Sequence, residues 1–217
     1  MEEFVAALET CASPRSPGLD RLPYEFYQKV GPIIAPSMIQ VYQQQLDAGL
    51  MAPSFRQGVT RLLSKVAHPQ VPKVTELRPI TLTNSDYKLQ SKMLGARMVK
   101  VLPKVLGNSG QLCSTLPKNI LCGVSELIST IDYVNLKKLS AFVVSFDIMK
   151  AYDKTCVPFV CQVLESMNFG QIFISWVRAM HKNITTRFIL GSMTKEIELL
   201  LSIRQGDPQA MNLFLVN

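Results

Sequence analysis

The sequence is poor in the residues that join chains covalently or hold zinc. It contains five cysteines and two histidines among 217 residues, and it has no Cys-x-x-Cys pair. An odd number of cysteines, most of them inside apolar runs, does not indicate a disulfide framework. We therefore expect reduced core cysteines of an intracellular protein, and no zinc site with the usual ligand spacings.

Long apolar runs and a basic leader are also missing. No apolar run approaches the roughly 18 residues of a membrane span. The first ten residues, MEEFVAALET, are acidic, whereas a signal or transit peptide would be basic there. These absences predict a protein of the nucleus or cytoplasm that does not bind a membrane.

Acidic residues are fewer than basic ones. The chain has 16 Asp and Glu against 23 Lys and Arg, which gives a net charge of +7, and its pI is near 9.2. This balance favours a polyanionic partner, with nucleic acid as the first candidate. Because the charge is mild, a soluble basic protein without such a partner is the alternative.

Hydrophobic residues make up 47% of the chain, which is enough for a substantial core. Their periodicity predicts an α+β fold in which helices surround a small antiparallel sheet. Helices are expected at 2–11, 22–30, 32–48, 85–106, 120–131, 158–170 and 172–180, and the apolar face of helix 120–131 is expected to lie in the core. Strands are expected at 58–66, 77–83 and 141–146, with a hairpin of 185–190 and 193–201 that turns at Gly191 and Ser192.

The stretch AFVVSFD, residues 141–147, carries the clearest chemical signal. Its β-branched and aromatic residues predict a strand buried on both faces, with Asp147 at the strand's end. A carboxylate fixed by a rigid strand suits Mg²⁺-dependent chemistry on phosphates, because the scaffold holds the oxygen that binds the ion. The alternative is that Asp147 only caps the helix that follows it.

Two further blocks stand on either side of this stretch. RPITL begins at Arg78, SFDIMKAYD contains Asp147, and RQGDP begins at Arg204. With SPGLDRLPYEFY, TNSDYK and TTRFIL, these blocks resemble the reverse transcriptase of non-LTR (LINE-type) retrotransposons, in which the three occur in the same order. The resemblance covers nearly the whole chain from Ser16 onward.

The resemblance implies a fold of reverse-transcriptase-like fingers and an incomplete palm. It divides the chain into an N-terminal helical extension at 1–15, a fingers-like region at 16–140 and a partial palm at 141–217. It implies RNA-directed DNA polymerase activity, with an RNA template, a DNA primer and deoxynucleoside triphosphates as partners. Such nucleotidyl transfer uses two divalent ions, here Mg²⁺, about 4 Å apart.

The resemblance also assigns the acidic residues. Asp147 matches the first metal-binding aspartate, and the backbone carbonyl of Ile148 is expected to add an oxygen ligand. Asp153 matches no ligand of the family, so a structural role is expected. Asp207, in the RQGDP block, is expected to cap the helix that follows it.

Five positions are candidates for contact with the nucleotide, and four of them match residues of the family. Arg78 matches a fingers arginine whose planar charged fork grips the triphosphate. Lys65 is either a second phosphate contact or a solvated lysine. Tyr152 matches the ring that leaves no room for a 2′-hydroxyl, although without the family a core aromatic residue is the preferred interpretation. Gln205 and Gly206 match the block that lies against the nucleotide and the template base.

The sequence departs from the family in three places. Gln111 and Lys118 belong to the loop expected to bind the template, but Leu116-Pro117-Lys118 stands where the family usually has Pro-Gly-Arg, which puts that contact in doubt. Gln209 replaces a small apolar residue or leucine. A hairpin with two adjacent aspartates, expected after RQGDP, does not occur among the 217 residues.

Three interpretations stay open. The chain is an inactive fragment of a reverse transcriptase, truncated or decayed; or a binding module that keeps the basic fingers and has lost catalysis; or an interaction protein recruited by the host that reuses the fold. Genomic sequence immediately downstream separates them: an interrupted Asp-Asp block after a stop codon supports the first, whereas a clean gene end under purifying selection supports the second or third.

Overall fold

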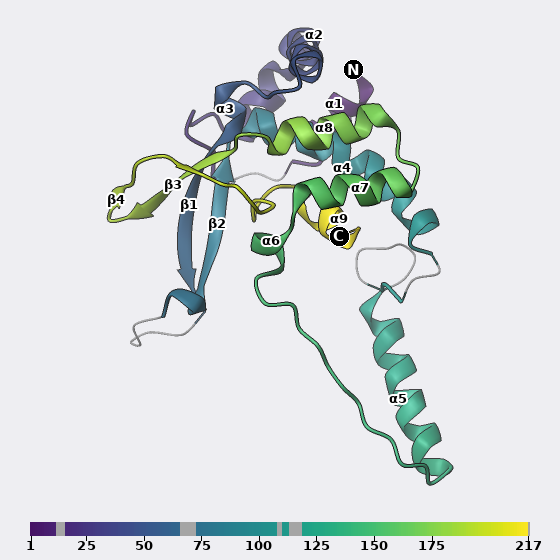
Figure 1. Ribbon diagram of the computed structural model, residues 1–217. Helices are drawn as coiled ribbons and strands as arrows, with labels where there is room; N and C mark the ends of the chain where they lie inside the picture. The colour runs from purple at the N-terminus through teal and green to yellow at the C-terminus, as the bar shows by residue number, and fades with distance from the viewer. Residues whose placement is uncertain (12–15, 66–72, 108–109, 113–118, 217) are drawn as a thin grey trace.

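The computed structural model describes residues 1–11, 16–65, 73–107, 110–112 and 119–216 (Figure 1). The helices are α1 (Glu2–Glu9), α2 (Tyr24–Ala48), α3 (Pro53–Arg56), α4 (Ser85–Val105), α5 (Ile120–Leu136), α6 (Ala151–Lys154), α7 (Val157–Ser166), α8 (Gln171–His181) and α9 (Ala210–Leu215). The strands are β1 (Gln57–Ser64), β2 (Leu77–Thr83), β3 (Thr185–Leu190), β4 (Ser192–Met193) and β5 (Ile197–Glu198), and a 3₁₀ turn, η1 (Val74–Glu76), precedes β2. The predicted α+β class is confirmed.

The sheet is mixed, so the prediction of a purely antiparallel sheet is wrong at one pairing. Its order is β2-β1-β3-β4, and β5 also pairs with β3. β1 and β2 form an antiparallel hairpin, whereas β3 runs parallel to β1. The reason lies in the connection: α8 ends beside α3, where Arg56 Nη1 donates to the Asn183 carbonyl at 3.4 Å. The chain therefore enters β3 at the same end as it enters β1.

Buried threonines join the three long strands. Thr60 Oγ1 on β1 lies 2.8 Å from Thr81 Oγ1 on β2 and 2.7 Å from Thr186 Oγ1 on β3. The Thr186 hydroxyl also donates to the Gly58 carbonyl at 3.3 Å. Buried hydroxyls need such partners, because an unpaired one is costly away from water. The threonines therefore fix the side-by-side register of β2, β1 and β3.

α2 is one helix, although two helices were predicted on either side of Pro32. It continues through Pro32 and Pro36 and ends, as predicted, at Gly49, which has a left-handed φ of 61°. Gly31 faces α1 so closely that an added Cβ would lie 2.6 Å from Leu8 Cδ1. Burial of one side of α2 against α1 and α4 outweighs the backbone hydrogen bonds that the prolines remove.

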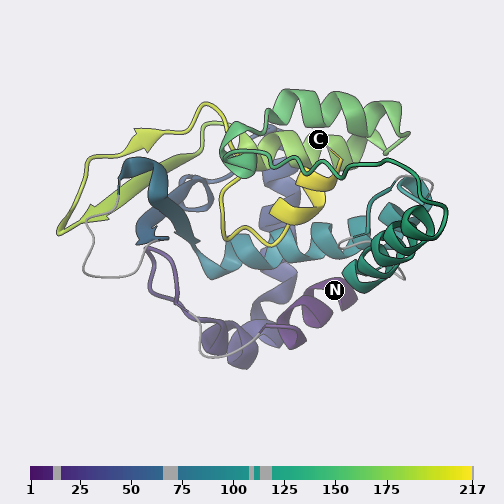
Figure 2. The ribbon, with the colours of Figure 1, turned by 90° about the horizontal axis from the view of Figure 1, so that it is seen from below.

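Two apolar cores share α4 and α8. The first joins α1 and α2 to them through aromatic residues such as Phe4, Tyr42 and Tyr87. The second packs α7 and α9 around residues such as Leu102 and Leu164. Figure 2 shows α4 running between the N-terminal helices on one side and α7, α8 and α9 on the other. No helix within the described ranges is long and apolar enough to cross a membrane.

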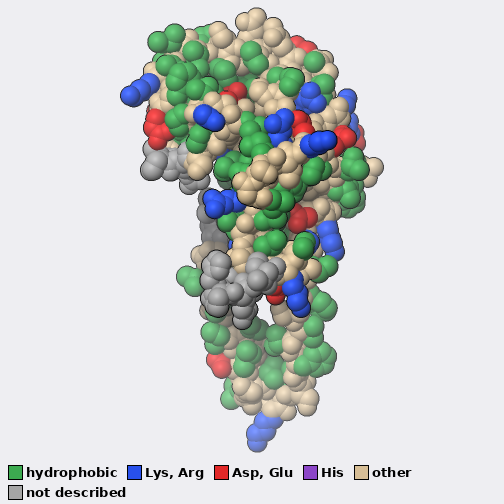
Figure 3. Space-filling model, turned by 90° about the vertical axis from the view of Figure 1, so that its left-hand side faces the viewer, with side chains coloured by type: hydrophobic (Ala, Val, Ile, Leu, Met, Phe, Trp, Pro, Cys, Tyr) green, Lys and Arg blue, Asp and Glu red, His purple; other side chains and the backbone are tan. Residues whose placement is uncertain are grey.

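α5 forms where a helix was predicted, but its apolar face is exposed rather than in the core. Ile120, Leu121 and Leu136 are 64, 72 and 79% exposed. In Figure 1 α5 projects from the body, and the following extended segment runs back from its far end. We call residues 120–149 the arm. Figure 3 shows its hydrophobic side chains on the surface of the part that extends below the body.

The predicted strand at 141–146 is also absent: the segment has no regular secondary structure. Phe142 and Phe146 are 89 and 90% exposed. A strand forms only where a neighbour offers a free edge for its backbone groups. In the part of the chain that the structure describes, the sheet strands pair with one another and none lies along this segment. The segment therefore has the apolar composition of a buried strand, but its side chains are exposed.

The arm gives a first prediction. Replacing Phe142 and Phe146 together by serine should leave the free energy of unfolding in urea unchanged within about 0.5 kcal/mol, because neither ring packs in a core. The same double substitution should reduce self-association in light scattering, because exposed apolar side chains promote aggregation. Phe4→Ser is the matched control: Phe4 is fully buried, so its loss should cost about 3 kcal/mol or more. An equal loss of stability in the double variant would contradict the exposed arm.

Asp86 gives a second prediction, about pH. It lies in the first turn of α4, where it accepts the Tyr87 N–H at 2.7 Å, and burial raises its pKa from 3.8 to about 6. Between these values the unfolded chain has lost the proton that the folded chain keeps. The folded state is therefore destabilised as pH rises from about 4 to 6.

Asp86→Asn removes this titration. From pH 4 to pH 7, its free energy of unfolding relative to the parent chain should rise by roughly 1–3 kcal/mol. Urea titrations at several pH values measure the difference. A difference that does not change over this interval would mean that Asp86 keeps its ordinary pKa in the folded protein.

Candidate functional site

One cavity of about 300 Å³ gathers side chains from four separate segments of the chain. The segments are the end of β1, the stretch from η1 into β2, residues 147–153, and residue 205. Six of the residues predicted to bind the metal or the nucleotide line it: Lys65, Arg78, Asp147, Ile148, Tyr152 and Gln205. Residues far apart in sequence thus share one hollow, which we call the candidate site.

The β1–β2 hairpin positions the two basic residues. Arg78 pairs with Leu63 in the ladder, and the Lys65 N–H donates to the Glu76 carbonyl at 2.9 Å just beyond β1. Lys65 and Arg78 are both exposed. Their backbones are therefore fixed by the hairpin, while their cationic ends remain accessible to an anion.

Residues 147–153 form an irregular turn and then α6. Lys150 has a left-handed backbone (φ 54°) and is the N-cap residue of α6, with no side-chain cap hydrogen bond. The alternative that Asp147 caps the following helix is therefore wrong. Asp147 is exposed and lies on the wall of the candidate site. Lys150 and Asp153 line the same cavity.

Tyr152 packs against a core and also lines the candidate site, while its contact with a nucleotide sugar stays a prediction. Its ring lies 5.4 Å from the Phe214 ring, centroid to centroid, and it packs against the second core. The same residue lines the candidate site. Its backbone carbonyl also accepts the Ile203 N–H at 3.1 Å. α9 and residue 203 thus hold Tyr152 at the edge of the cavity.

The RQGD turn lies against β2. The Thr81 N–H donates to the Gln205 carbonyl at 2.9 Å. Gly206 has a φ of 109°, and an added Cβ there would lie 2.6 Å from the Thr81 carbonyl oxygen. Only glycine fits this conformation and this close approach. Gly206 does not line the candidate site; it lines a second, larger cavity.

A buried polar network fixes this turn, and sequence reasoning missed most of it. Asp207 accepts hydrogen bonds from the hydroxyls of Tyr87 and Ser91, which lie one turn apart on α4. It also accepts the Gln209 N–H at 2.9 Å. Gln209 is the N-cap residue of α9, and α9 has no side-chain cap hydrogen bond, so the prediction that Asp207 caps this helix is wrong. The Arg204 guanidinium lies over the Tyr87 ring, 4.4 Å from its centroid. The i, i+4 spacing of Tyr87 and Ser91 places both hydroxyls on one face of the helix, and this is the sequence feature that could have indicated the network.

Tyr87 and Arg204, which belong to this network, are both buried away from solvent. Tyr87 is fully buried, and burial raises the pKa of its hydroxyl above the ordinary range. The hydroxyl therefore stays protonated and donates to Asp207. Arg204, only 2% exposed, donates through Nη1 to the Arg56 carbonyl at 3.1 Å. The network joins α3, α4 and the RQGD turn.

Of the two residues predicted to bind the template, the structure describes Gln111. Gln111 is absent from the described residues that line either of them. Lys118 lies outside the described residues. Template contact by these two positions therefore stays a prediction.

The acidic residues allow only a small metal site. Asp147 and Asp153 both line the candidate site. Across the described residues, no group of three or more His, Cys, Asp and Glu side chains is placed to hold a metal. Mg²⁺ in phosphoryl chemistry is held by one or two carboxylates together with substrate phosphates. Binding of Mg²⁺ by Asp147 with a substrate phosphate therefore stays a prediction.

Gly206 provides a direct test of the turn. Gly206→Ala should cost about 1–3 kcal/mol, because alanine is strained at this φ and its Cβ would collide with Thr81. Gly110→Ala is the matched control, since nothing lies within 4 Å of a Cβ at Gly110. Urea unfolding of both variants measures the costs. Equal stabilities would show that the turn does not have the described conformation.

Comparison with known proteins gives one informative similarity. No family model matches the chain. The chain is 26% identical over 215 residues to a protein of Xenopus laevis described as "Transposon TX1 uncharacterized 149 kDa protein". The match covers 99% of this chain and 16% of that protein, so the chain spans about a sixth of its relative's length. By sequence, therefore, this chain is similar to one segment of a much longer transposon-encoded protein.

Proposed function

We propose that this chain is the fingers and the first part of the palm of a non-LTR retrotransposon reverse transcriptase, an RNA-directed DNA polymerase. The observation that carries the proposal is the candidate site. Residues that the resemblance assigns to one nucleotide site, among them Arg78, Asp147 and Gln205, come from separate segments and line one cavity. The similarity to a transposon-encoded protein supports the same origin. In this proposal residues 1–15 are an extension, 16–140 fingers and 141–217 partial palm.

The charges of the cavity suit a deoxynucleoside triphosphate. Lys65, Arg78 and Lys150 bring three cationic side chains to its wall. The planar Arg78 fork binds phosphate oxygens in pairs, and a lysine acts as a point charge. Their attraction for the triphosphate would bring its phosphates to this wall of the cavity.

Asp147, with the Ile148 carbonyl, would hold Mg²⁺ beside these cations. When bound, the ion neutralises phosphate charge and favours ionisation of the primer's 3′-hydroxyl. Side chains of the protein would select the sugar and contact the base. Tyr152, held against Phe214, would exclude a ribose 2′-hydroxyl, and Gln205 would bond to the nucleotide or the base opposite without adding charge.

Residues 1–217 alone should not extend a primer. Asp147 alone offers one negative charge, whereas two ions carry four positive charges, and Mg²⁺ gives up its water reluctantly. A second ion would be poorly placed, and an error of about 1 Å can cost roughly 100-fold in rate. Primer extension on an RNA template with Mg²⁺ should therefore give no product.

A chimera tests the assignment of residues. Adding the aspartate hairpin and thumb of a related element should restore incorporation of deoxynucleotides. In this chimera, Asp147→Ala should reduce the rate at least about 100-fold, and Tyr152→Ala should relax discrimination against ribonucleotides. Asp132→Ala is a control, because Asp132 lies on exposed α5 and lines neither cavity. An active chimera that is indifferent to Asp147→Ala would overturn the catalytic assignment.

The second candidate is a nucleic-acid-binding or host-recruited interaction protein that lacks catalysis. The observations that favour it are the net charge of +7 and the small acidic donor set in the described residues. The chimera experiment also distinguishes this candidate from the polymerase proposal. A folded chimera that binds an RNA·DNA hybrid, more weakly at higher salt, yet incorporates no nucleotide would favour this candidate.

A further inference from the structure

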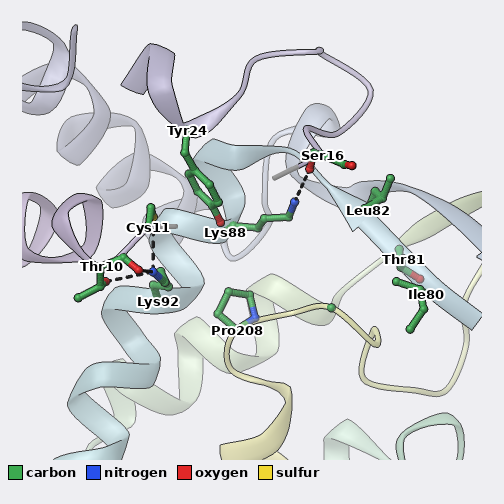
Figure 4. A pocket seen from close by; sticks show the side chains of 11 residues that line it. Thr10, Cys11, Ser16, Tyr24, Ile80, Thr81, Leu82, Lys88, Lys92 and Pro208 are labelled. Carbon is green, nitrogen blue, oxygen red and sulfur yellow. Dashed lines mark hydrogen bonds between the residues drawn. The ribbon is translucent and has the colours of Figure 1, made fainter. Parts of the chain in front are cut away.

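A lysine of α4 contacts the residues that follow α1. Lys92 Nζ donates to the Thr10 carbonyl at 2.7 Å and to the Thr10 hydroxyl at 3.0 Å. The same nitrogen donates to Cys11 Sγ at 3.4 Å, and dashed lines in Figure 4 mark these contacts. A thiol and a primary amine, both nucleophilic groups, are therefore in direct contact although they lie 81 positions apart in the sequence.

Other contacts hold the sulfur and the nitrogen in place. The Cys11 thiol donates to the Ala7 carbonyl, one turn earlier in α1, at 3.2 Å. The Gln28 side chain on α2 donates to the Cys11 carbonyl at 3.2 Å. Near the other end of α1, Arg97 on α4 forms an ion pair with Glu3 at 2.5 Å. The packing of α1 on α4 therefore maintains the contact between sulfur and nitrogen.

The pair borders a space that small molecules can enter. Thr10, Cys11 and Lys92 all line the second, larger cavity, of about 540 Å³. Only 6% of Cys11 is exposed, which excludes bulky reagents. A molecule little larger than water, such as hydrogen peroxide, fits easily into a cavity of this volume.

The other described cysteines are placed elsewhere. Cys11 belongs to the first apolar core and Cys161 to the second. Cys122 is exposed on α5, and Cys156 precedes α7. A cysteine sulfenic acid condenses with a neighbouring thiol or a neighbouring nitrogen. At Cys11 the neighbouring nitrogen is Lys92 Nζ.

We propose that Cys11 and Lys92 form an oxidative cross-link, a sulfenamide, which joins the end of α1 to α4. In the first step the Cys11 sulfur attacks one oxygen of hydrogen peroxide, the oxidant. The S–O bond forms and the O–O bond breaks, and the leaving hydroxide takes the thiol proton to become water. The sulfur is oxidised to a sulfenic acid, and the peroxide is reduced.

The second step needs no further oxidant. Lys92, once its ammonium group has lost a proton to water, attacks the Cys11 sulfur through Nζ. The S–N bond forms as the S–O bond breaks, and the departing hydroxide takes one amine proton to become water. A small thiol reverses the link: it attacks the sulfur and releases the amine, and a second thiol reduces the resulting mixed disulfide.

The link also changes stability. It closes a loop between residues 81 positions apart, and a bond that closes a long loop restricts the unfolded chain. The melting temperature of the peroxide-treated chain should therefore rise by about 5 °C or more. Dithiothreitol should return it to the original value.

The first measurement uses the unaltered chain. The folded, reduced protein is treated with hydrogen peroxide, its remaining thiols are alkylated, and it is digested with trypsin without a reducing agent. Mass spectrometry should find residues 1–15 joined to residues 89–97, lighter by two hydrogen atoms than the sum of the two peptides. Dithiothreitol should remove this product. Treatment in denaturing urea should not form it, because α1 and α4 then no longer hold the two atoms together.

The second measurement uses Lys92→Arg. Arginine keeps the positive charge and the donors for Thr10, but its guanidinium stays protonated and does not attack sulfur. The cross-link should be lost, and dimedone should instead trap the sulfenic acid at Cys11. Lys100→Arg is the matched control, since Lys100 is an exposed lysine of the same helix. This control should form the cross-link as the parent chain does.

Either of two results would overturn the proposal. One is that the folded, treated parent chain yields Cys11 without the cross-link, whether unmodified or as sulfinic acid. The other is that the cross-linked peptides appear equally in Lys92→Arg or in urea. Neither result depends on primer extension by the chimera, so this proposal and the proposed function are tested separately.

Discussion

The buried carboxylate of Asp207 is the contact on which the arrangement of both cavities depends. It accepts hydrogen bonds from Tyr87 and Ser91 of α4 and from the backbone of Gln209. A carboxylate that is 7% exposed is stable only when such donors surround it. Hydrogen bonds to a charged group contribute about 1.5–3 kcal/mol each. Asp207 therefore anchors the RQGD turn to the helix that both apolar cores share.

The position of that turn decides what each neighbouring residue can contact. With Asp207 held by α4, the Gln205 carbonyl meets the Thr81 N–H, and the chain passes over β2 at a distance that only glycine allows. Gln205, at this crossing, lines the candidate site, and the next residue, Gly206, lines the second, larger cavity. The two hollows are thus consequences of a single backbone crossing, although different side chains line them. A variant that disturbs Asp207 should affect both together.

Local chemistry in the sequence predicted much of the fold. Strand 77–83 has the predicted bounds, and α2 ends at Gly49 as predicted. Both features depend on a short stretch of sequence: the pattern of residues in a strand, and a glycine that adopts a left-handed φ at the end of a helix. The grouping of Arg78, Asp147 and Gln205 came from the family resemblance. The predictions that were wrong concern contacts between segments that lie far apart in the sequence. The apolar run 141–146 and the face of α5 could be placed in a core only by knowing what covers them, and composition does not carry that information. The parallel direction of β3 depends on where α8 ends, and Tyr87 and Ser91 depend on a carboxylate more than a hundred positions away.

The parallel pairing of β1 with β3 imposes a delay between the synthesis of the two strands. Thr186 and Gly58, which share a hydrogen bond across this pair, are 128 positions apart in the chain. At synthesis rates of about 5–20 residues per second, roughly 6–26 seconds separate the appearance of the two strands. During that interval β1 can form its hairpin with β2, but its other edge has no partner. A chaperone that covers free strand edges would have its longest period of action on this chain while α4 to α8 are being made.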